Sequence, residues 1–403
     1  MYPLEGIRVL DFSWVGAGPF VTKPLADHGA EVIKIESRSR LDVIRSMHPF
    51  KDGVPGIERS GYYANRNSSK YGMTLNLKTP KGIEIARELI RRSDVVVNNF
   101  SAHVMDKLGL GYEEARKLKP DIIYLSMPMQ GSTGPHSQYK GYGLTIGALS
   151  GLYALTGHPG EEPCGTGTNY PDHAPNPLHG AIAILAALHY RRKTGKGQYI
   201  ELSQFESTVN MLGPALMDAA NNGSVAERMG NHSPDASPHN VYPCRGEDRW
   251  IAIAVESEEE WRRFREALGR PESLEDARFD GVKNRKAHEA ELDRRIAAIT
   301  AGWDAGELFT HLQRHKVKAG VVQNAEEVLR DEQLLARQHW VYLEHPEMGR
   351  SVYDAPPYKF THLKNGLRSP APLLGQHTRE VCRRILDMDD ETFEQLSKEG
   401  VFH

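Results

Sequence analysis

The run GIRVLDFSWVGAGPFVTKPLADHGAEVIKIE, residues 6–36, contains the pattern that decides the fold. Short apolar runs at residues 7–12 and 32–35 are typical of buried strands, and we expect a helix between them. Similar apolar runs follow at residues 95–97 and 122–125. Strands that alternate with helices predict a mostly parallel sheet covered on both faces, so the chain is assigned to the α/β class.

Two helices in this region have clear start signals. Thr79 and Pro80 supply a cap and a first-position proline, and apolar residues follow them at helical spacing. A second helix begins near Asn176 and Pro177, with Asn176 as the expected cap, and ends near Gly195. In sheets of this class ligands bind beyond the carboxyl ends of the strands. Residues that follow the strands are therefore the first candidates for a site.

The amino-acid composition and the hydrophobic periodicity of the sequence change after residue 220. Residues 221–240 are rich in Asn, Gly, Ser and Pro and show little periodicity, which indicates a linker or an active-site loop. Residues 1–220 are predicted to form the first part of a large domain, and residues 241–330 a small α/β domain. Residues 331–403 are predicted to return to the large domain.

Composition and charge narrow the class of protein. The chain has 403 residues, and 50 basic against 53 acidic side chains give a formal net charge of −3. This balance produces no field that would attract nucleic acid or an anionic membrane surface. The three scattered cysteines favour a reducing compartment, and no zinc site is expected on them. With no signal peptide and no long apolar run in view, we expect a cytoplasmic protein.

Several common catalytic signatures are absent. The sequence contains no HExxH, no GxSxG and no Walker phosphate loop. The turn after the first strand reads VGAGP, residues 15–19, instead of the GxGxxG of dinucleotide-binding folds. A dinucleotide-dependent dehydrogenase is therefore disfavoured.

Blocks distributed over almost the entire chain resemble the class III CoA-transferases. These blocks are the run at residues 6–36, NSSKYGMTLNLKTPKG at 67–82, DVVVNNF at 94–100, MDKLGLGYEE at 105–114, GSTGP at 131–135, ILAALHYRRKTGKGQYIELS at 184–203 and APLLGQHT at 371–378. The resemblance implies a large Rossmann-like domain built from the N-terminal and C-terminal parts, plus a small domain. It also implies an interlocked dimer, acyl-CoA and carboxylic acid substrates, and no tightly bound cofactor or metal.

The resemblance also implies a nucleophilic aspartate before the helix that contains ILAAL. Asp172 is the candidate, although it lies one residue upstream of the commonest family register, which His173 occupies. A one-residue insertion is the simpler assumption, because histidine cannot form an acyl anhydride. A carboxylate can become a mixed anhydride and then a thioester, and return unchanged. The N-terminus of the next helix is expected to keep Asp172 ionised; the alternative role, a helix cap, already belongs to Asn176.

Further residues match positions that line CoA in the family. At the ADP end, cations and polar donors are expected to meet the phosphates. For each cation the alternative is an ordinary solvated surface charge. The candidates are Arg38, Lys70, Asn99, Phe100, Lys107, Lys140 and Tyr142.

Three functions remain open. The first is reversible transfer of CoA from an acyl-CoA, with succinyl-CoA as the candidate donor, to a free carboxylic acid. The second is racemisation of 2-methylacyl-CoA, which needs a paired His and Asp; Tyr142 stands where the racemases have the histidine, which favours the transferase. The third is a catalytically silent subunit in a heteromer with a paralogous chain, so both a homodimer and a heteromer remain open.

Overall fold

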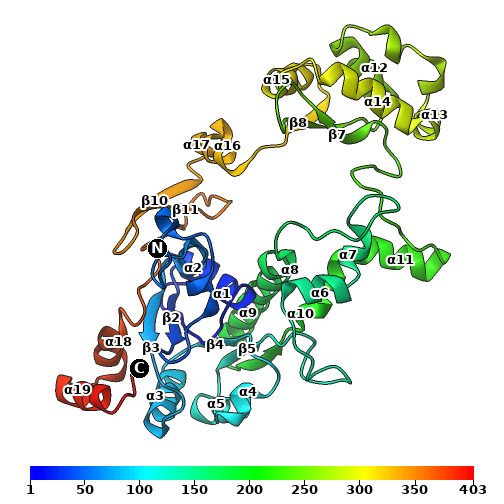
Figure 1. Cartoon of the computed structure of the whole chain (residues 1–403). Helices are drawn as coiled ribbons and strands as arrows, with labels where there is room; N and C mark the ends of the chain where they lie inside the picture. The colour runs from blue at the N-terminus through cyan, green and yellow to red at the C-terminus, as the bar shows by residue number, and fades with distance from the viewer. The chain divides into compact units, whose positions relative to one another are not determined.

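Six parallel strands form the central sheet of the computed structural model, which describes all of residues 1–403 (Figure 1). Leu10 pairs with Ile33 on one side and with Val96 on the other, so β1 lies in the middle of the sheet. In spatial order the strands are β3 (Tyr71–Thr74), β2 (Glu31–Glu36), β1 (Arg8–Asp11), β4 (Val95–Asn98), β5 (Ile123–Ser126) and β6 (Gln198–Glu201). Strands β2 and β3 are therefore added on one side of β1 and strands β4 to β6 on the other, as in a doubly wound Rossmann sheet.

Alternate residues of the strands face two separate cores. Leu10 packs with α3 (Pro80–Arg91), α5 (Tyr112–Leu118) and α18 (Thr378–Leu386) on one face. Its neighbour Val9 packs with α1 (Ala17–Asp27) and α9 (Pro175–Thr194) on the other. Near-continuous burial along strands such as β2 and β4 is what the apolar runs predicted, because both faces of a parallel sheet are covered. The α/β assignment is confirmed.

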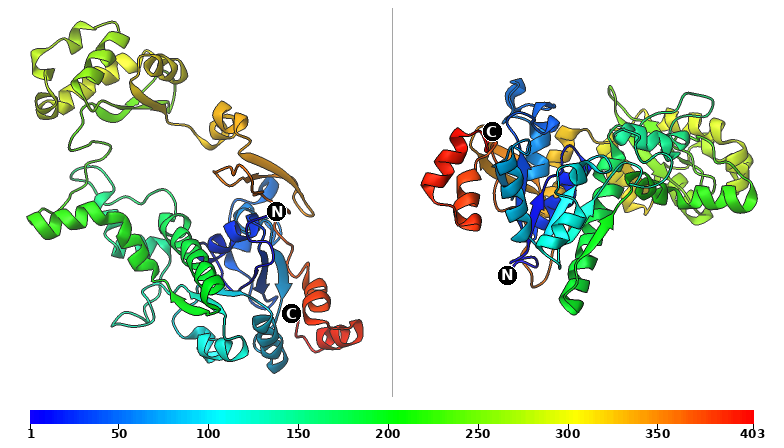
Figure 2. Two further views of the ribbon diagram at one scale, coloured as in Figure 1. Left: turned by 180° about the vertical axis from the view of Figure 1, so that it is seen from behind. Right: turned by 90° about the horizontal axis from the view of Figure 1, so that it is seen from below.

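The C-terminal segment returns to the edge of the same sheet. His377 donates its backbone N–H to Gly72 of β3 at 2.9 Å, and Asn76 donates to the carbonyl of Val401 at 2.8 Å. Figure 2 shows the C-terminal helices, in red, beside the N-terminal strands, in blue. They are α18 and α19 (Asp390–Lys398).

The chain divides into two compact units. The larger one contains Met1–Tyr153, Gly165–Val225 and Gln333–His403. It also holds a two-stranded antiparallel sheet of β10 (Trp340–His345) and β11 (Gly349–Asp354). Its remaining helices are α2 (Gly61–Asn67), α4 (Val104–Lys107), α6 (Gly143–Leu149), α8 (Tyr170–His173), α10 (Gln204–Val209) and α11 (Gly213–Asn222), while α7 (Leu152–Leu155) and α17 (Glu332–Ala336) lie at its boundaries.

The smaller unit contains Ala154–Cys164 and Ala226–Glu332. The sequence had assigned residues 154–164 to the large domain, because so short a segment carries no periodicity of its own. An antiparallel sheet packs on helices around a core that includes Trp261, Phe264 and Phe279. The elements of this unit are β7 (His239–Pro243), β8 (Trp250–Ala254), β9 (Lys318–Val321), α12 (Glu258–Ala267), α13 (Val282–Ala287), α14 (Glu289–Thr300), α15 (Ala305–Arg314) and α16 (Ala325–Arg330). None of the helices of the chain combines the length and apolar character that a bilayer span requires.

Candidate active site

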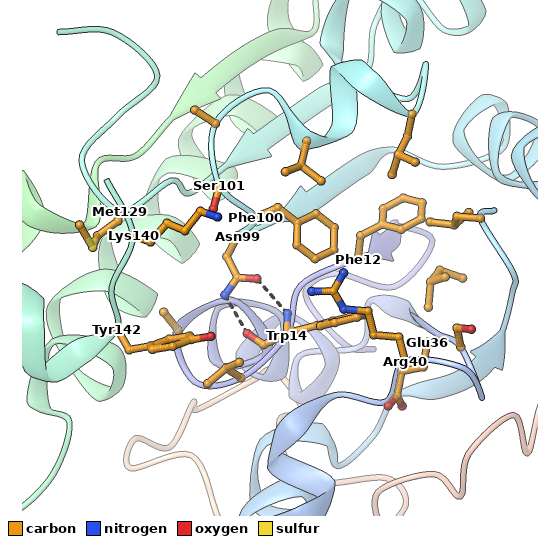
Figure 3. Close-up of a pocket in the computed structure, with 18 of the residues that line it drawn as sticks. Phe12, Trp14, Glu36, Arg40, Asn99, Phe100, Ser101, Met129, Lys140 and Tyr142 are labelled. Carbon is orange, nitrogen blue, oxygen red and sulfur yellow. Dashed lines mark hydrogen bonds between the residues drawn. The ribbon is translucent and has the colours of Figure 1, made fainter. Parts of the chain in front are cut away.

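A cavity of about 570 Å³ opens in the large unit beyond the carboxyl ends of the parallel strands. The segments that follow β1, β2, β3, β4 and β5 all contribute to its wall, together with part of the chain before α6. This is the position expected for a ligand in a doubly wound sheet, where loops on either side of the switch point diverge. Figure 3 shows Lys140 and Tyr142 on one side of the cavity and Arg40 on the other, with Trp14, Asn99 and Phe100 between them.

The switch point itself is fixed by a pair of hydrogen bonds. Asn99, after β4, accepts from the backbone N–H of Trp14 at 2.8 Å and donates from Nδ2 to the Trp14 carbonyl at 2.7 Å (Figure 3). Gly18 lies directly beneath this contact, where a Cβ would come within 2.3 Å of Ser13 Cβ and 3.0 Å of Asn99 Cγ. The VGAGP turn therefore provides close packing of the loop against the neighbouring strand end.

The wall of the cavity combines aromatic rings with cations. Phe100 packs edge-on against Trp14 with ring centroids 5.6 Å apart, and the Arg40 guanidinium lies 5.2 Å from the Trp14 ring centroid. Four cations line the cavity, and none forms an ion pair with a carboxylate of the chain: Arg40, Lys78, Lys107 and Lys140. Unpaired cations beside apolar rings suit a ligand that carries phosphates on an otherwise less polar body.

Asp172 lies at the cavity on the one-turn helix α8 and is buried. Two glycines from different elements make room for it. A Cβ on Gly16 would come within 2.9 Å of Asp172 Cβ, and a Cβ on Gly143 within 2.6 Å of Asp172 Oδ2. Burial raises the pKa of Asp172 to about 6, although the backbone N–H of Gly143 and the charge of Arg66 both act to lower it.

His173, the next residue, belongs to different surroundings. Its Nδ1 lies 2.6 Å from Arg66 Nη2, and its Nε2 lies 3.4 Å from the Tyr62 hydroxyl. Burial and the charge of Arg66 lower the pKa of His173 to about 4. Of the two adjacent residues only Asp172 lines the cavity. The one-residue insertion assumed from the sequence stays a prediction.

One expectation about the surroundings of Asp172 is wrong. Asn176 does not cap α9, because the helix begins at Pro175 and Asn176 lies inside its first turn, where Nδ2 donates to Gln204 Oε1 at 3.3 Å. Ala174 separates α8 from α9. Removal of the Asp172 carboxyl from water raises its pKa to about 6, a value that still leaves it mostly ionised at pH 7.

Six of the eight residues proposed from the sequence line this one cavity. They are Asp172, Asn99, Phe100, Lys107, Lys140 and Tyr142. Arg38 and Lys70 do not line it. A bridge between Ser37 and Arg40 turns the chain there, and it is Arg40 and not Arg38 that lines the cavity.

Lys70 is buried beneath the sheet ends and forms part of the framework. Its Nζ donates to the Pro19 carbonyl at 2.8 Å and to Asn67 Oδ1 at 3.0 Å, and lies 3.3 Å from Asp11 Oδ2. Burial lowers the pKa of Lys70 to about 8, against the opposing effect of Asp11. An ammonium with all its donors used inside the chain is unsuited to a ligand phosphate, so the prediction for Lys70 is corrected.

Arg40, Lys78 and Trp14 are cavity residues that the sequence reasoning missed or set aside. Arg40 is two residues beyond the predicted arginine, and Lys78 follows the end of β3. A rule that every cation within a few residues of a predicted strand end is a candidate would have found Arg40, but not Lys78, because no strand was predicted at residues 71–74. Trp14 gave only the signal of a large apolar residue near a strand end, which usually indicates core.

Comparison with known proteins agrees with this geometry. Residues 4–378 match the family described as CoA-transferase family III. The chain is similar to succinyl-CoA–D-citramalate CoA-transferase of Chloroflexus aurantiacus, at 31% identity over 99% of this chain and 98% of the relative. It is also similar to succinyl-CoA:glutarate CoA-transferase of Mus musculus, at 32% identity over 100% of this chain and 90% of the relative.

Among solved structures, a CAIB/BAIF family protein from Brucella suis superimposes with a TM-score of 0.87. The two proteins share 30% identity, and the alignment covers 95% of this chain and 99% of that one. These matches extend over nearly the whole chain, so the similarity to the family does not rest on a single motif. The protein is therefore an enzyme of CoA transfer, and it belongs to CoA-transferase family III.

Proposed function

We propose that the enzyme moves CoA reversibly from an acyl-CoA to a free carboxylic acid, with Asp172 as the nucleophile. One observation carries this proposal: the carboxyl of Asp172 lies at a cavity whose other residues include four cations without ion-pair partners. A nucleophile and a set of phosphate-binding groups in one cavity are what a CoA thioester requires. The dimer expected from the family resemblance stays a prediction.

The chemistry proceeds without net consumption of water or protons. An oxygen of Asp172 attacks the thioester carbonyl, the C–S bond breaks, and CoA thiolate leaves a mixed anhydride on Asp172. The thiolate then attacks the aspartyl carbonyl, which releases the first acid as a carboxylate and leaves an aspartyl-CoA thioester. The incoming carboxylate attacks the aspartyl carbonyl of this thioester, the C–S bond breaks, and CoA thiolate leaves the second anhydride on Asp172. Thiolate attack on its acyl carbonyl gives the new acyl-CoA and restores Asp172.

The wall of the cavity suits the long CoA arm. Arg40 and the three lysines offer charge-assisted hydrogen bonds to phosphate oxygens, and Trp14 and Phe100 offer apolar contact to the rest of the nucleotide. Binding energy from this remote part of the substrate would hold the thiolate next to the anhydride between the steps. The Gly143 N–H, which approaches the Asp172 carboxyl, is suited to stabilise negative charge on an oxygen there.

The racemase alternative is supported less well. Racemisation needs an acid and a base on opposite sides of the α-carbon, usually including a histidine in this superfamily, and no histidine lines the cavity. His173 faces Arg66 and Tyr62 instead. The silent-subunit alternative is disfavoured because Asp172 and its glycine neighbours are all present.

The relatives indicate the class of acid. Two of them are named for succinyl-CoA as donor, with D-citramalate or glutarate as acceptor. We infer that succinyl-CoA is a donor of this enzyme and that its acceptor is another small organic acid.

The test is to incubate the protein with a panel of acyl-CoAs that includes succinyl-CoA, trap with hydroxylamine, and map the modified peptide by mass spectrometry. We expect a hydroxamate on Asp172, because hydroxylamine attacks both the anhydride and the aspartyl thioester at the same carbonyl. Asp172→Ala is expected to lose exchange while still binding CoA. The control Asp390→Ala removes an exposed aspartate outside both cavities and should still be labelled at Asp172. Turnover retained by Asp172→Ala, or labelling at another residue, would overturn the assignment.

A further inference from the structure

A second cavity, of about 790 Å³, lies in the large unit on the His173 side of α8. Tyr62 and Arg66 of α2 form one part of its wall, and Asn169 and His173 form another. Asp172 lines the first cavity, and its neighbour His173 on α8 lines the second. Tyr62 and Asp172 also flank the same glycine, because a Cβ on Gly16 would lie 3.3 Å from the Tyr62 hydroxyl and 2.9 Å from Asp172 Cβ.

Arg66 is half-buried and no carboxylate of the chain contacts it, in contrast to the two fully buried arginines. Arg45 pairs with Glu36 at 2.8 Å, and Arg285 pairs with Glu258 at 2.8 Å. Arg66 instead donates from Nη1 to Asn65 Oδ1 at 2.7 Å, and its buried Nε has no partner. The carboxylate of Asp354, which is near enough to influence Arg66, accepts from Asn65. A guanidinium removed from water in this way is normally compensated by an anion.

The orientation of Arg66 is fixed by its neighbours. Its guanidinium packs 4.0 Å from the Phe20 ring centroid. Arginine has only donors, so the contact of 2.6 Å from Nη2 makes His173 Nδ1 the acceptor. The lowered pKa of His173 agrees, because the neutral ring has a lone pair at that nitrogen. The proton of the neutral ring is then on Nε2, where it points to the Tyr62 oxygen at 3.4 Å.

We propose that Arg66 binds the second carboxylate of a dicarboxylic acid whose first carboxylate, or thioester, reacts at Asp172. The proposal rests on the proposed function and specifies its substrate class. A pre-oriented guanidinium that no carboxylate of the chain contacts can donate to a ligand carboxylate from the Nη hydrogens that Asn65 and His173 leave free. A monocarboxylic acid of the same length has no second carboxylate to accept these hydrogen bonds. His173 acts here as a positioning residue, which holds the guanidinium and takes no part in the transfer.

The test compares two four-carbon donors that differ only at the far end, succinyl-CoA and butyryl-CoA. The readout is the rate of hydroxamate formation on Asp172 as a function of donor concentration, at pH 8, where Asp172 stays ionised even without the Arg66 charge. We expect the wild-type enzyme to prefer succinyl-CoA, and Arg66→Met to slow labelling by succinyl-CoA about 10-fold to 100-fold, the range of a charged hydrogen bond. Labelling by butyryl-CoA should stay within about threefold. Arg66→Lys should recover part of the preference.

Arg91→Met is the matched control, because Arg91 is an exposed arginine on α3 outside both cavities. It should leave the preference between the donors unchanged. Equal losses with both donors in Arg66→Met, or an unchanged preference, would overturn the proposal while leaving Asp172 as the nucleophile. Calorimetric titration with free succinate gives a readout that needs no turnover. Binding to the wild type and its loss in Arg66→Met supports the role of Arg66, and equal binding by both proteins contradicts it even if no acyl-CoA labels Asp172.

Discussion

At the scale of single residues, Asp172 is the group whose protonation should govern the reaction. Burial raises its pKa to about 6, and only the ionised carboxylate can attack a thioester. The single-turnover rate of adduct formation should therefore rise about tenfold per pH unit below pH 6 and level off above pH 7.

The measurement is quenched-flow labelling at saturating acyl-CoA from pH 5 to pH 8, which separates the chemical step from pH effects on binding of the CoA phosphates. Arg66→Met should shift the midpoint to higher pH, since the positive charge of Arg66 lowers the pKa of Asp172. A rate that is flat between pH 5 and pH 7 would mean that the nucleophile is another group, or that substrate binding changes its environment completely.

At the scale of elements, the carboxyl of Asp172 depends on the turn before α1 and on the start of α6. Both places are glycine because the Asp172 side chain occupies the volume that a Cβ would need. Gly143→Ala would place Cβ 2.6 Å from Asp172 Oδ2, so the carboxyl must move away from the Gly143 N–H. We expect adduct formation to fall about 100-fold or more with little change in the fold.

Gly213→Ala is the matched control for Gly143→Ala. Gly213 is also the first residue of a helix, α11, but nothing lies within 4 Å of an added Cβ there. This control should keep its activity and its far-ultraviolet circular dichroism spectrum. Equal activity in Gly143→Ala and Gly213→Ala would show that the position of the Asp172 carboxyl does not depend on Gly143.

Local sequence patterns predict whole strands and helices but not which distant residues meet in the site. The strands β1, β2, β4 and β5 and the capped helix α3 were predictable because burial on both faces, or a Thr–Pro start, leaves a local pattern. The sequence could not show that Arg40 lines the cavity in place of Arg38, because a single bridge between Ser37 and Arg40 shapes the chain there. Lys70 and Arg66 depend on partners far along the chain, respectively Asp11 and His173, and no local pattern reports such pairings.

At the scale of the whole molecule, α9 presents a surface that suits a second chain. One side of this helix is buried through Ala181, Ile184 and Ala187, but Leu178 and Ile182 are 59% and 63% exposed. A helix that is apolar on all sides is normally covered on all sides. This exposed face supports the expected pairing with another copy or with a paralogous chain, which stays a prediction.

The last residues of the chain complete the large unit and hold one wall of the cavity. Phe402 is buried and stacks on Phe393 with ring centroids 4.9 Å apart, and its carbonyl accepts from Thr74 Oγ1 at 3.0 Å. Asn76, which lines the cavity, donates its backbone N–H to Val401. The end of β3 therefore depends on residues more than 300 positions away in the sequence.

Phe402→Ala should consequently weaken both stability and acyl-CoA binding. Loss of a buried phenylalanine costs about 3 kcal/mol, so the urea midpoint should fall and the amides of β3 should exchange faster with solvent. Because Asn76 and Lys78 lie at the cavity, the KM for acyl-CoA should rise while the rate of the chemical step at Asp172 is kept. Phe360→Ala removes a phenylalanine that is 43% exposed in the same unit and should change neither quantity appreciably. If Phe402→Ala lowered the urea midpoint but left KM unchanged, the C-terminal residues would stabilise the sheet without holding the cavity wall.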